Sequence, residues 1–251
     1  MSAIPIETNT DAVAQAESRR RIVRVWDLPV RIFHWSLVIA IAAAYATGEF
    51  GGGEWAVWHG RIGSLVLALM VFRVIWGFIG TEHARFRSFV PTPARVTAYL
   101  QGRWQSAGHN PLGAFSVIVL LTLVAAQVGT GLFANDDIAF AGPLADWIGK
   151  GASERATSWH EQIFYVLAGF ILLHILAIVF YLLVRGANLV APMITGNKRL
   201  PDGQHLPAER HLAWRFVAAV LVATTVSWLT FRDVSSVQPE AAPPPAATAD
   251  W

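Results

Sequence analysis

Five apolar runs, each long enough to cross a lipid bilayer, constrain this chain more than any other feature. They occupy residues 30–48, 56–79, 111–134, 159–184 and 212–231. A helix rises 1.5 Å per residue, so about 20 residues span the ~30 Å hydrocarbon core of a membrane. Because a spanning segment must satisfy its own backbone hydrogen bonds, the sequence predicts an all-α integral membrane protein with five transmembrane helices.

The composition agrees with this class and narrows the chemistry. Hydrophobic residues make up 54% of the chain and charged residues only 14%, whereas about a quarter of a soluble domain is charged. The net charge of +2 does not favour nucleic acid as a partner. The chain has no cysteine, which excludes disulfides, cysteine-ligated zinc, iron–sulfur clusters and a covalently attached haem. A redox centre would therefore be non-covalent, and the eight histidines are its main candidate ligands.

Loop charges predict the orientation in the membrane, because cytoplasmic loops are enriched in Lys and Arg. Basic residues gather before the first run and in the second and fourth loops, whereas the first and third loops are more acidic. We therefore expect a cytoplasmic N-terminus and a C-terminus on the outer side of the membrane. The basic residues are Arg19, Arg20, Arg21, Arg24, Arg31, Arg85, Arg87, Arg95, Arg103, Arg185, Lys198, Arg199 and Arg210.

The same pattern divides the chain into five parts. We expect a mobile cytoplasmic tail at 1–21, a four-helix bundle at 22–186, a cytoplasmic loop at 187–211, a fifth transmembrane helix at 212–232 and a disordered periplasmic tail at 233–251. One alternative concerns the first run, since Ala44-Tyr45-Ala46 resembles a signal-peptidase site. The long charged region before it and the interfacial aromatics Trp26, Phe33 and Trp35 favour a retained helix.

Four histidines lie inside these runs, and an ionisable residue within a membrane is a functional hypothesis by default. By the predicted topology, His34 lies near the inner side of the membrane, and His59 and His160 lie near the outer side. His174 follows His160 by 14 residues, which is about 21 Å of helical rise and returns it to the inner side. Fourteen residues at about 100° each come within about 40° of four full turns, so His160 and His174 share one helix face.

Two levels with two histidines each predict two stacked haems, each held by a pair of imidazoles. The expected pairs are His34 with His174 and His59 with His160. Interhelical hydrogen bonds are the alternative for any single histidine. A zinc site is the other alternative, but it would need three or four ligands that converge on one point.

Other residues near these levels have two interpretations each. Gly63 and Gly169 suit the close approach of a flat cofactor, although small residues also serve helix packing. Arg31 and Arg61 lie at the depths where haem propionates would emerge, or they extend to the interface as ordinary arginines. His109 could contact an inner-haem propionate, a quinone or only the interface. His83, His205 and His211 lie in loops or at a helix start, where solvation is the usual state.

Several strings in the sequence resemble one family. The string from Arg24 to Trp35, RVWDLPVRIFHW, is similar to the opening of the bacterial cytochrome b561 and nickel–iron hydrogenase b-type cytochrome family. WHGRIG at 58–63, GHNPLG at 108–113 and WHE at 159–161 followed by His174 resemble its later motifs. The resemblance covers about residues 22–186. It implies a four-helix core with two b haems held by the same histidine pairs, and the fifth run goes beyond a minimal member.

The resemblance also implies a function. Members pass electrons between membrane quinone and a partner such as a hydrogenase subunit or a periplasmic cytochrome c. We therefore expect a di-haem electron carrier in the bacterial inner membrane that contacts lipid, quinone and an outer-side partner. No catalytic residue is assigned. Whether the protein is an enzyme, and whether it forms a homodimer, is left open. One alternative is superoxide oxidation with quinone as acceptor, which the acidic outer loops disfavour for an anionic substrate. The other is a non-redox membrane anchor or metal-binding transporter.

Overall fold

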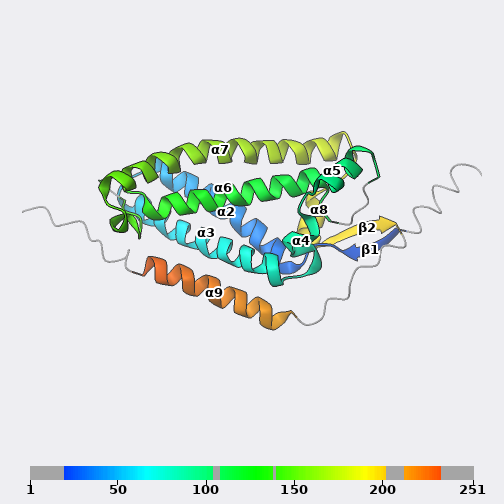
Figure 1. Ribbon diagram of the computed structural model, residues 1–251, viewed down its shortest axis with the longest axis horizontal. Coiled ribbons are helices and arrows are strands. Elements are labelled where there is room, and N and C mark those ends of the chain that lie inside the picture. The colour runs from blue at the N-terminus through cyan, green and yellow to red at the C-terminus, as the bar shows by residue number, and fades with distance from the viewer. Residues whose placement is uncertain (1–19, 104–107, 138–139, 202–211, 233–251) are drawn as a thin grey trace, which may run out of the picture.

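The computed structural model describes residues 20–103, 108–137, 140–201 and 212–232, which are largely helical (Figure 1). Five of the described helices are long and apolar enough to cross a membrane, which confirms the predicted fold class. They are α2 (Leu28–Phe50), α3 (Gly53–Ile79), α6 (Pro111–Phe133), α7 (Lys150–Leu183) and α9 (Ala213–Phe231). The shorter elements are β1 (Arg20–Arg24), η1 (Glu82–Ala84), α4 (Phe86–Phe89), α5 (Pro93–Leu100), η2 (Ala145–Trp147), α8 (Val190–Thr195) and β2 (Asn197–Pro201).

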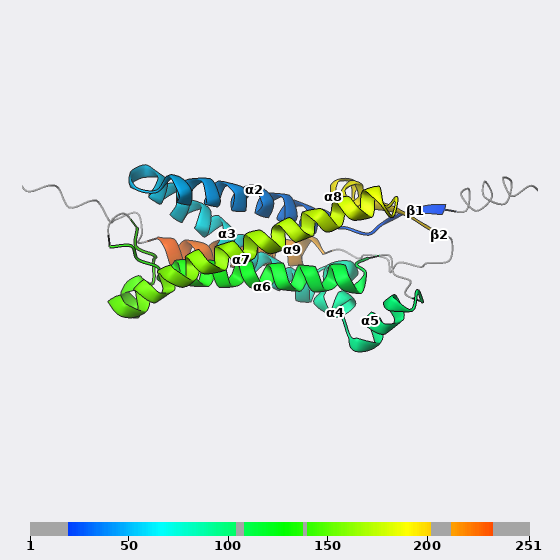
Figure 2. The ribbon, with the colours of Figure 1, turned by 90° about the horizontal axis from the view of Figure 1, so that it is seen from above.

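The first four long helices form two antiparallel hairpins, α2 with α3 and α6 with α7, which meet along α3 and α6 (Figures 1 and 2). Helix α7 begins at Lys150, nine residues before the apolar run that predicted it. Its first turns are polar but contain no helix breaker after Gly151, so hydropathy marks only the apolar part of a longer helix.

Local sequence signals explain where these helices begin and end. Asp27 caps α2, since its Oδ1 accepts a hydrogen bond of 2.7 Å from the backbone N–H of Val30. Asn110 caps α6 in the same way, with Pro111 in the first helical position. Between α2 and α3 the chain reverses through three consecutive glycines at 51–53, all with positive φ. Glycine adopts this backbone conformation without the strain that a side chain would add.

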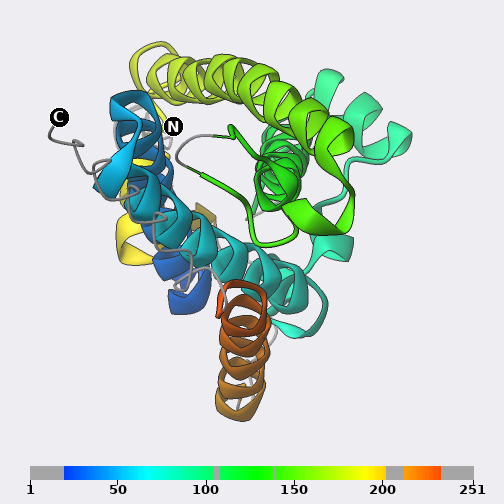
Figure 3. The same ribbon diagram turned by 90° about the vertical axis from the view of Figure 1, so that its left-hand side faces the viewer.

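Helix α9 packs outside the four-helix bundle, against α3 (Figure 3). Its contact face is a stripe of small residues spaced four apart: Ala219, Ala223 and Ser227 are 1%, 2% and 6% exposed. Small side chains let two membrane helices approach closely. The hydroxyl of Ser227 also donates a hydrogen bond of 2.7 Å to the carbonyl of Ser64 on α3.

A two-stranded antiparallel sheet lies beyond the end of the bundle at which α2 begins (Figure 1). Strand β1 pairs with β2 so that Ile22 faces Arg199 and Arg24 faces Asn197. The predicted loop at 187–211 therefore contains α8 and β2, and its residues 202–211 lie outside the described part. The predicted tails also lie outside it, apart from residues 20 and 21.

Candidate functional site

His59 of α3 and His160 of α7 face each other near one end of the bundle. Their ring centroids are 6.1 Å apart, and the ring planes cross at 81°. A bond from an imidazole nitrogen to a metal is about 2 Å long, and each nitrogen lies about 1 Å from its ring centre, so two rings that share one metal have centroids about 6 Å apart. The observed separation therefore suits one metal ion between the two rings.

The other nitrogen of each ring is engaged by backbone. Nδ1 of His59 lies 2.9 Å from the carbonyl oxygen of Ala44, and Nδ1 of His160 lies 2.9 Å from the carbonyl oxygen of Gln127. A carbonyl oxygen can only accept, so each Nδ1 carries the proton and each Nε2 keeps its lone pair. This tautomer is the one that binds a metal through Nε2, and its orientation is fixed by the backbone.

A Thr-Gly pair accompanies each of these two histidines. Thr47 of α2 places its Oγ1 3.4 Å from Nδ1 of His59, and Thr130 of α6 places its Oγ1 3.3 Å from Nδ1 of His160. Each threonine follows the carbonyl acceptor by three residues. The sequence analysis did not detect this repeat, although the dipeptide recurs near the end of the first and third apolar runs.

The glycine of each pair leaves room for the imidazole. A Cβ at Gly48 would lie 3.2 Å from the ring of His59, and a Cβ at Gly131 would lie 2.9 Å from the ring of His160. The second distance is shorter than real Cβ contacts, so a side chain at Gly131 would displace the ring. The two helix hairpins thus support their histidines in the same way.

His34 of α2 and His174 of α7 form the second pair, further along the bundle, and lie close enough to interact electrostatically. Nδ1 of His174 lies 3.4 Å from the hydroxyl of Ser116 on α6. Nδ1 of His34 is buried and has no hydrogen-bond partner among the residues that the structure describes. We call His59 with His160 the outer tier and His34 with His174 the inner tier.

An apolar layer separates the two tiers. Its buried residues include Ala40, Val66, Val124 and Leu167, contributed by α2, α3, α6 and α7. Leu167 lies midway between His160 and His174 on α7, seven residues from each, and is 3% exposed. The two histidine pairs are therefore two separate sites. Among the described residues, no three His, Asp or Glu side chains form a group that could hold a metal, which disfavours the zinc alternative.

The arginines and glycines named from the sequence have varied surroundings. The guanidinium of Arg61 stacks 5.1 Å from the centre of the Trp58 ring. Arg31 donates to the carbonyl of Ile194, while its Nε is buried without a partner among the described residues. A Cβ at Gly63 or Gly169 would meet no atom within 4 Å, so neither glycine is required for contact between the helices themselves.

His109 and His83 lie at the inner end of the bundle. The ring of His109 packs 4.5 Å from Trp26 and 5.1 Å from Phe89. Burial, reinforced by positive charge on neighbouring side chains, lowers the pKa of His109 to about 4. His83 is partly buried and its Nε2 is fully covered, so the expectation that it is solvated is wrong. The remaining two loop histidines, at 205 and 211, lie outside the described residues.

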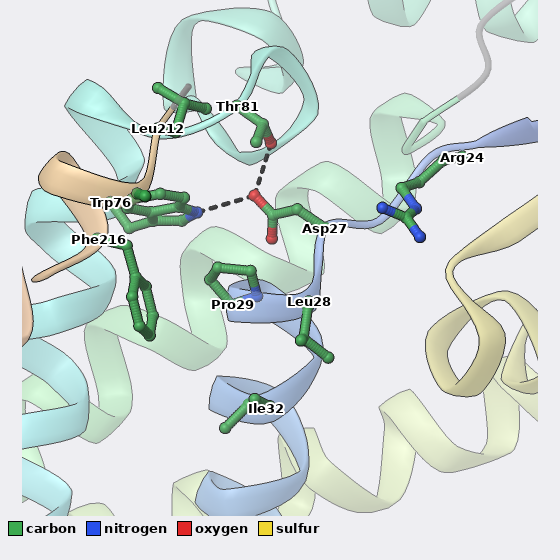
Figure 4. Close-up of a pocket in the computed structure, with 10 residues that line it drawn as sticks. Arg24, Asp27, Leu28, Pro29, Ile32, Trp76, Thr81, Leu212 and Phe216 are labelled. Carbon is green, nitrogen blue, oxygen red and sulfur yellow. Dashed lines mark hydrogen bonds between the residues drawn. The ribbon is translucent and has the colours of Figure 1, made fainter. Parts of the chain in front are cut away.

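A groove of about 350 Å³ opens beside the start of α2, between α3 and α9 (Figure 4). Asp27 lies at its base, where its Oδ2 accepts hydrogen bonds from Trp76 (2.9 Å) and Thr81 (2.7 Å). Together with its capping bond to α2, this carboxylate connects α2, α3 and the segment that follows α3. Asp27 therefore has a structural role, which the sequence analysis did not assign.

Apolar helices that face histidines toward one another inside the bundle are the features of a membrane-bound cytochrome. The chain belongs to the prokaryotic cytochrome b561 family, whose model matches residues 25–196. It is therefore a multi-pass membrane protein of a b-type cytochrome family, and haem b is the cofactor that this family implies. The match ends before α9.

Curated relatives cover most of the chain at low identity. A protein of Rhizobium leguminosarum bv. viciae is 24% identical over 76% of this chain and 95% of its own length. One from Azotobacter vinelandii is 25% identical over 73% and 91%, and one from Escherichia coli K12 is 22% identical over 74% and 94%. The first two are described as a probable Ni/Fe-hydrogenase B-type cytochrome subunit, and the third as that of hydrogenase 1. No solved structure matches this chain.

Proposed function

We propose that this protein is a di-haem b-type cytochrome that transfers electrons between membrane quinone and a redox partner on the outer side of the membrane. The observation that carries the proposal is the outer tier. The rings of His59 and His160 have the separation that a shared metal requires, and backbone carbonyls fix both in the ligating tautomer.

Each tier would hold one haem. His59 and His160 would bind the outer haem, and His34 and His174 the inner one, with the porphyrin filling space between the hairpins. The haem iron supplies reversible one-electron chemistry, while the chain fixes ligand identity, ring orientation and burial, which together set the reduction potential. The apolar layer around Leu167 keeps water from the path between the tiers.

The partner and the orientation follow from the relatives and from the loop charges. Since the similar proteins are described as hydrogenase cytochrome subunits, a hydrogenase-like subunit is the first candidate, and a periplasmic cytochrome c is the second. The basic loops favour a cytoplasmic N-terminus. The outer tier would then receive or deliver electrons at the partner's side, and quinone would exchange with the chain from the lipid.

Haem stoichiometry tests the proposal. A pyridine haemochrome assay on protein purified after expression with ample haem should give two haems b per chain. His34→Ala and His174→Ala should each lower this number to one, and so should His59→Ala and His160→Ala. His211→Ala, outside both tiers, is the control and should keep two. A wild-type protein without haem would refute the proposal, and a single haem would refute its two-tier form.

A further inference from the structure

The inner end of the bundle gathers basic side chains from separate parts of the chain. Arg73 lies on α3, His83 in η1, His109 before α6 and Lys198 on β2, and the charges of the other three all act on His109. Arg73 is only 4% exposed. Burying positive or ionisable groups together is costly unless negative charge lies nearby.

The acidic residues close to this cluster are already engaged. Asp27 accepts hydrogen bonds from Val30, Trp76 and Thr81. Glu82 forms ion pairs with Arg85 and Arg87 at 3.7 and 3.4 Å. Asp27 attracts Arg73, and Asp27 and Glu82 both attract His83, but no hydrogen bond between either carboxylate and Arg73, His83 or His109 is found among the described residues.

Two nitrogen atoms of the cluster are buried without a hydrogen bond. They are Nδ1 of His109 and Nε2 of His83, and neither has a partner among the described residues. The two histidines are neighbours, since a Cβ at Gly108 would lie 3.3 Å from Nδ1 of His83. Buried polar atoms in native proteins are nearly always satisfied, so two orphaned nitrogens beside a buried arginine indicate an acceptor that the described residues do not supply.

The cluster lies next to the inner tier. Ser116 contacts His174, and His109 precedes Ser116 by seven residues, which is about 10 Å toward the inner end by helical rise. His109 also interacts electrostatically with His174. A haem held by His34 and His174 would carry its two carboxylates into this neighbourhood if they point toward the nearer membrane surface, which is the polar side.

We propose that His83, His109 and Arg73 form a carboxylate-binding pocket that receives the propionates of the inner-tier haem. The inference rests on the proposed function, because it requires a haem at His34 and His174. A propionate would accept from the orphaned nitrogens and add negative charge beside His109, on which only positive neighbours act. Hydrogen bonds between charged groups are shorter and stronger than neutral ones, so this pocket would also orient the inner haem.

The reduction potential of the inner haem tests the pocket. In His109→Leu, loss of the donor leaves more negative charge uncompensated near the iron, so the reduction equilibrium of the inner haem should shift about tenfold toward the oxidised form, or about 59 mV for one electron. His83→Leu should act in the same direction. His109→Gln, which keeps an N–H donor, should retain most of the wild-type potential. The outer haem, identified in His34→Ala, should not change.

Haem exchange provides a second test. Wild-type protein loaded with haem dimethyl ester, whose propionates are esterified and uncharged, should have a raised inner potential, because negative charge near the iron is gone. In ester-loaded protein, His109→Leu should produce little further change, because no carboxylate is left for His109 to compensate. If quinone rather than propionate contacts His109, His109→Leu will shift the inner potential equally with haem and with its ester, and that result overturns the pocket. Equal inner potentials in His109→Leu and wild type also overturn it, whereas loss of both haems from wild type would instead refute the proposed function.

Discussion

The two tiers use the same ligand type but support it differently. In the outer tier, both histidines donate to backbone carbonyls and pack against a glycine. In the inner tier, His174 has only a distant serine hydroxyl, and Nδ1 of His34 has no partner among the described residues. Backbone of a helix cannot rearrange without breaking the helix, so the outer tier is organised by the fold. The inner tier depends more on side chains and on what binds there.

Gly131→Val should have the largest effect, because it should remove the outer haem while the inner haem stays. The new side chain would begin 2.9 Å from the ring of His160, which must then leave its carbonyl partner and its ligating position. Gly129→Val is the matched control, because a Cβ there meets no atom within 4 Å. Haem content by pyridine haemochrome should fall from two to one only in the first variant. Two haems in both variants would show that the outer ring tolerates displacement.

Acid should destabilise the packing around His109. Burial, together with the positive charges of Arg73, His83, His174 and Lys198, lowers the pKa of His109 to about 4, below the 6.5 of an unfolded chain. Between these values the unfolded chain binds more protons, so stability is lost as the pH falls from about 6.5 toward about 4, by at most about 3 kcal/mol.

Haem-depleted protein in detergent should therefore have a lower thermal midpoint at pH 5 than at pH 7. His109→Leu should show a smaller difference between the two pH values, since the titrating group is gone. Propionates bound beside His109 would oppose its neutralisation, so haem-loaded wild type should also be less sensitive to acid. If the thermal midpoint falls equally between pH 7 and pH 5 in haem-depleted wild type and in His109→Leu, another group controls the acid response.

Haem removal should distinguish the tiers by rate. An excess of apomyoglobin, which captures released haem, should extract the inner haem about tenfold faster than the outer one. The reason is that one or two additional hydrogen bonds to ligating histidines, each contributing about 1 kcal/mol, hold the outer pair in place. Loss of absorbance in two phases, assigned with His34→Ala, would measure both rates. Faster release of the outer haem would contradict the proposal that the outer tier holds its haem more firmly than the inner tier.

The smallest effect should come from the hydroxyl groups. Ser116→Ala removes the only side-chain contact shown for Nδ1 of His174, whereas Thr130→Val leaves His160 its carbonyl partner. Ser116→Ala should weaken binding of the inner haem by about 1 kcal/mol. Thr130→Val should weaken binding of the outer haem by less than half of that. Haem titration of depleted protein would measure both, and equal losses would argue against backbone control of the outer tier.

The sequence predicted the long elements well because each follows from a run of apolar residues. The five spans and the family were confirmed. The rings of His59 and His160 lie 6.1 Å apart, and haem ligation by the four histidines stays a prediction. The contacts of a single residue with its neighbours were harder to predict from the sequence. Nothing in a serine at position 227 indicates its carbonyl acceptor on α3. Likewise, the sequence pattern predicts a loop at His83, and only the packing of the folded chain shows that its Nε2 is covered.

The packing of α9 illustrates the same limit. The stripe formed by Ala219, Ala223 and Ser227 has helical spacing, but alanines every four residues are also common on lipid-facing helices. Only the surface of α3 determines which face is buried. Asp27 is similar, since capping of α2 follows from its position before Leu28-Pro29, whereas its bonds to Trp76 and Thr81 join segments about fifty residues away.

The crossed planes of the His59 and His160 rings have a spectroscopic consequence. Parallel imidazoles split the two iron d orbitals that overlap with the ligand π systems, but rings at 81° act on both orbitals almost equally. Low-spin ferric iron held between them should then retain a large orbital magnetic moment. Electron paramagnetic resonance of the oxidised protein should show a strongly anisotropic signal from this centre, and His34→Ala, with only this haem left, should keep it.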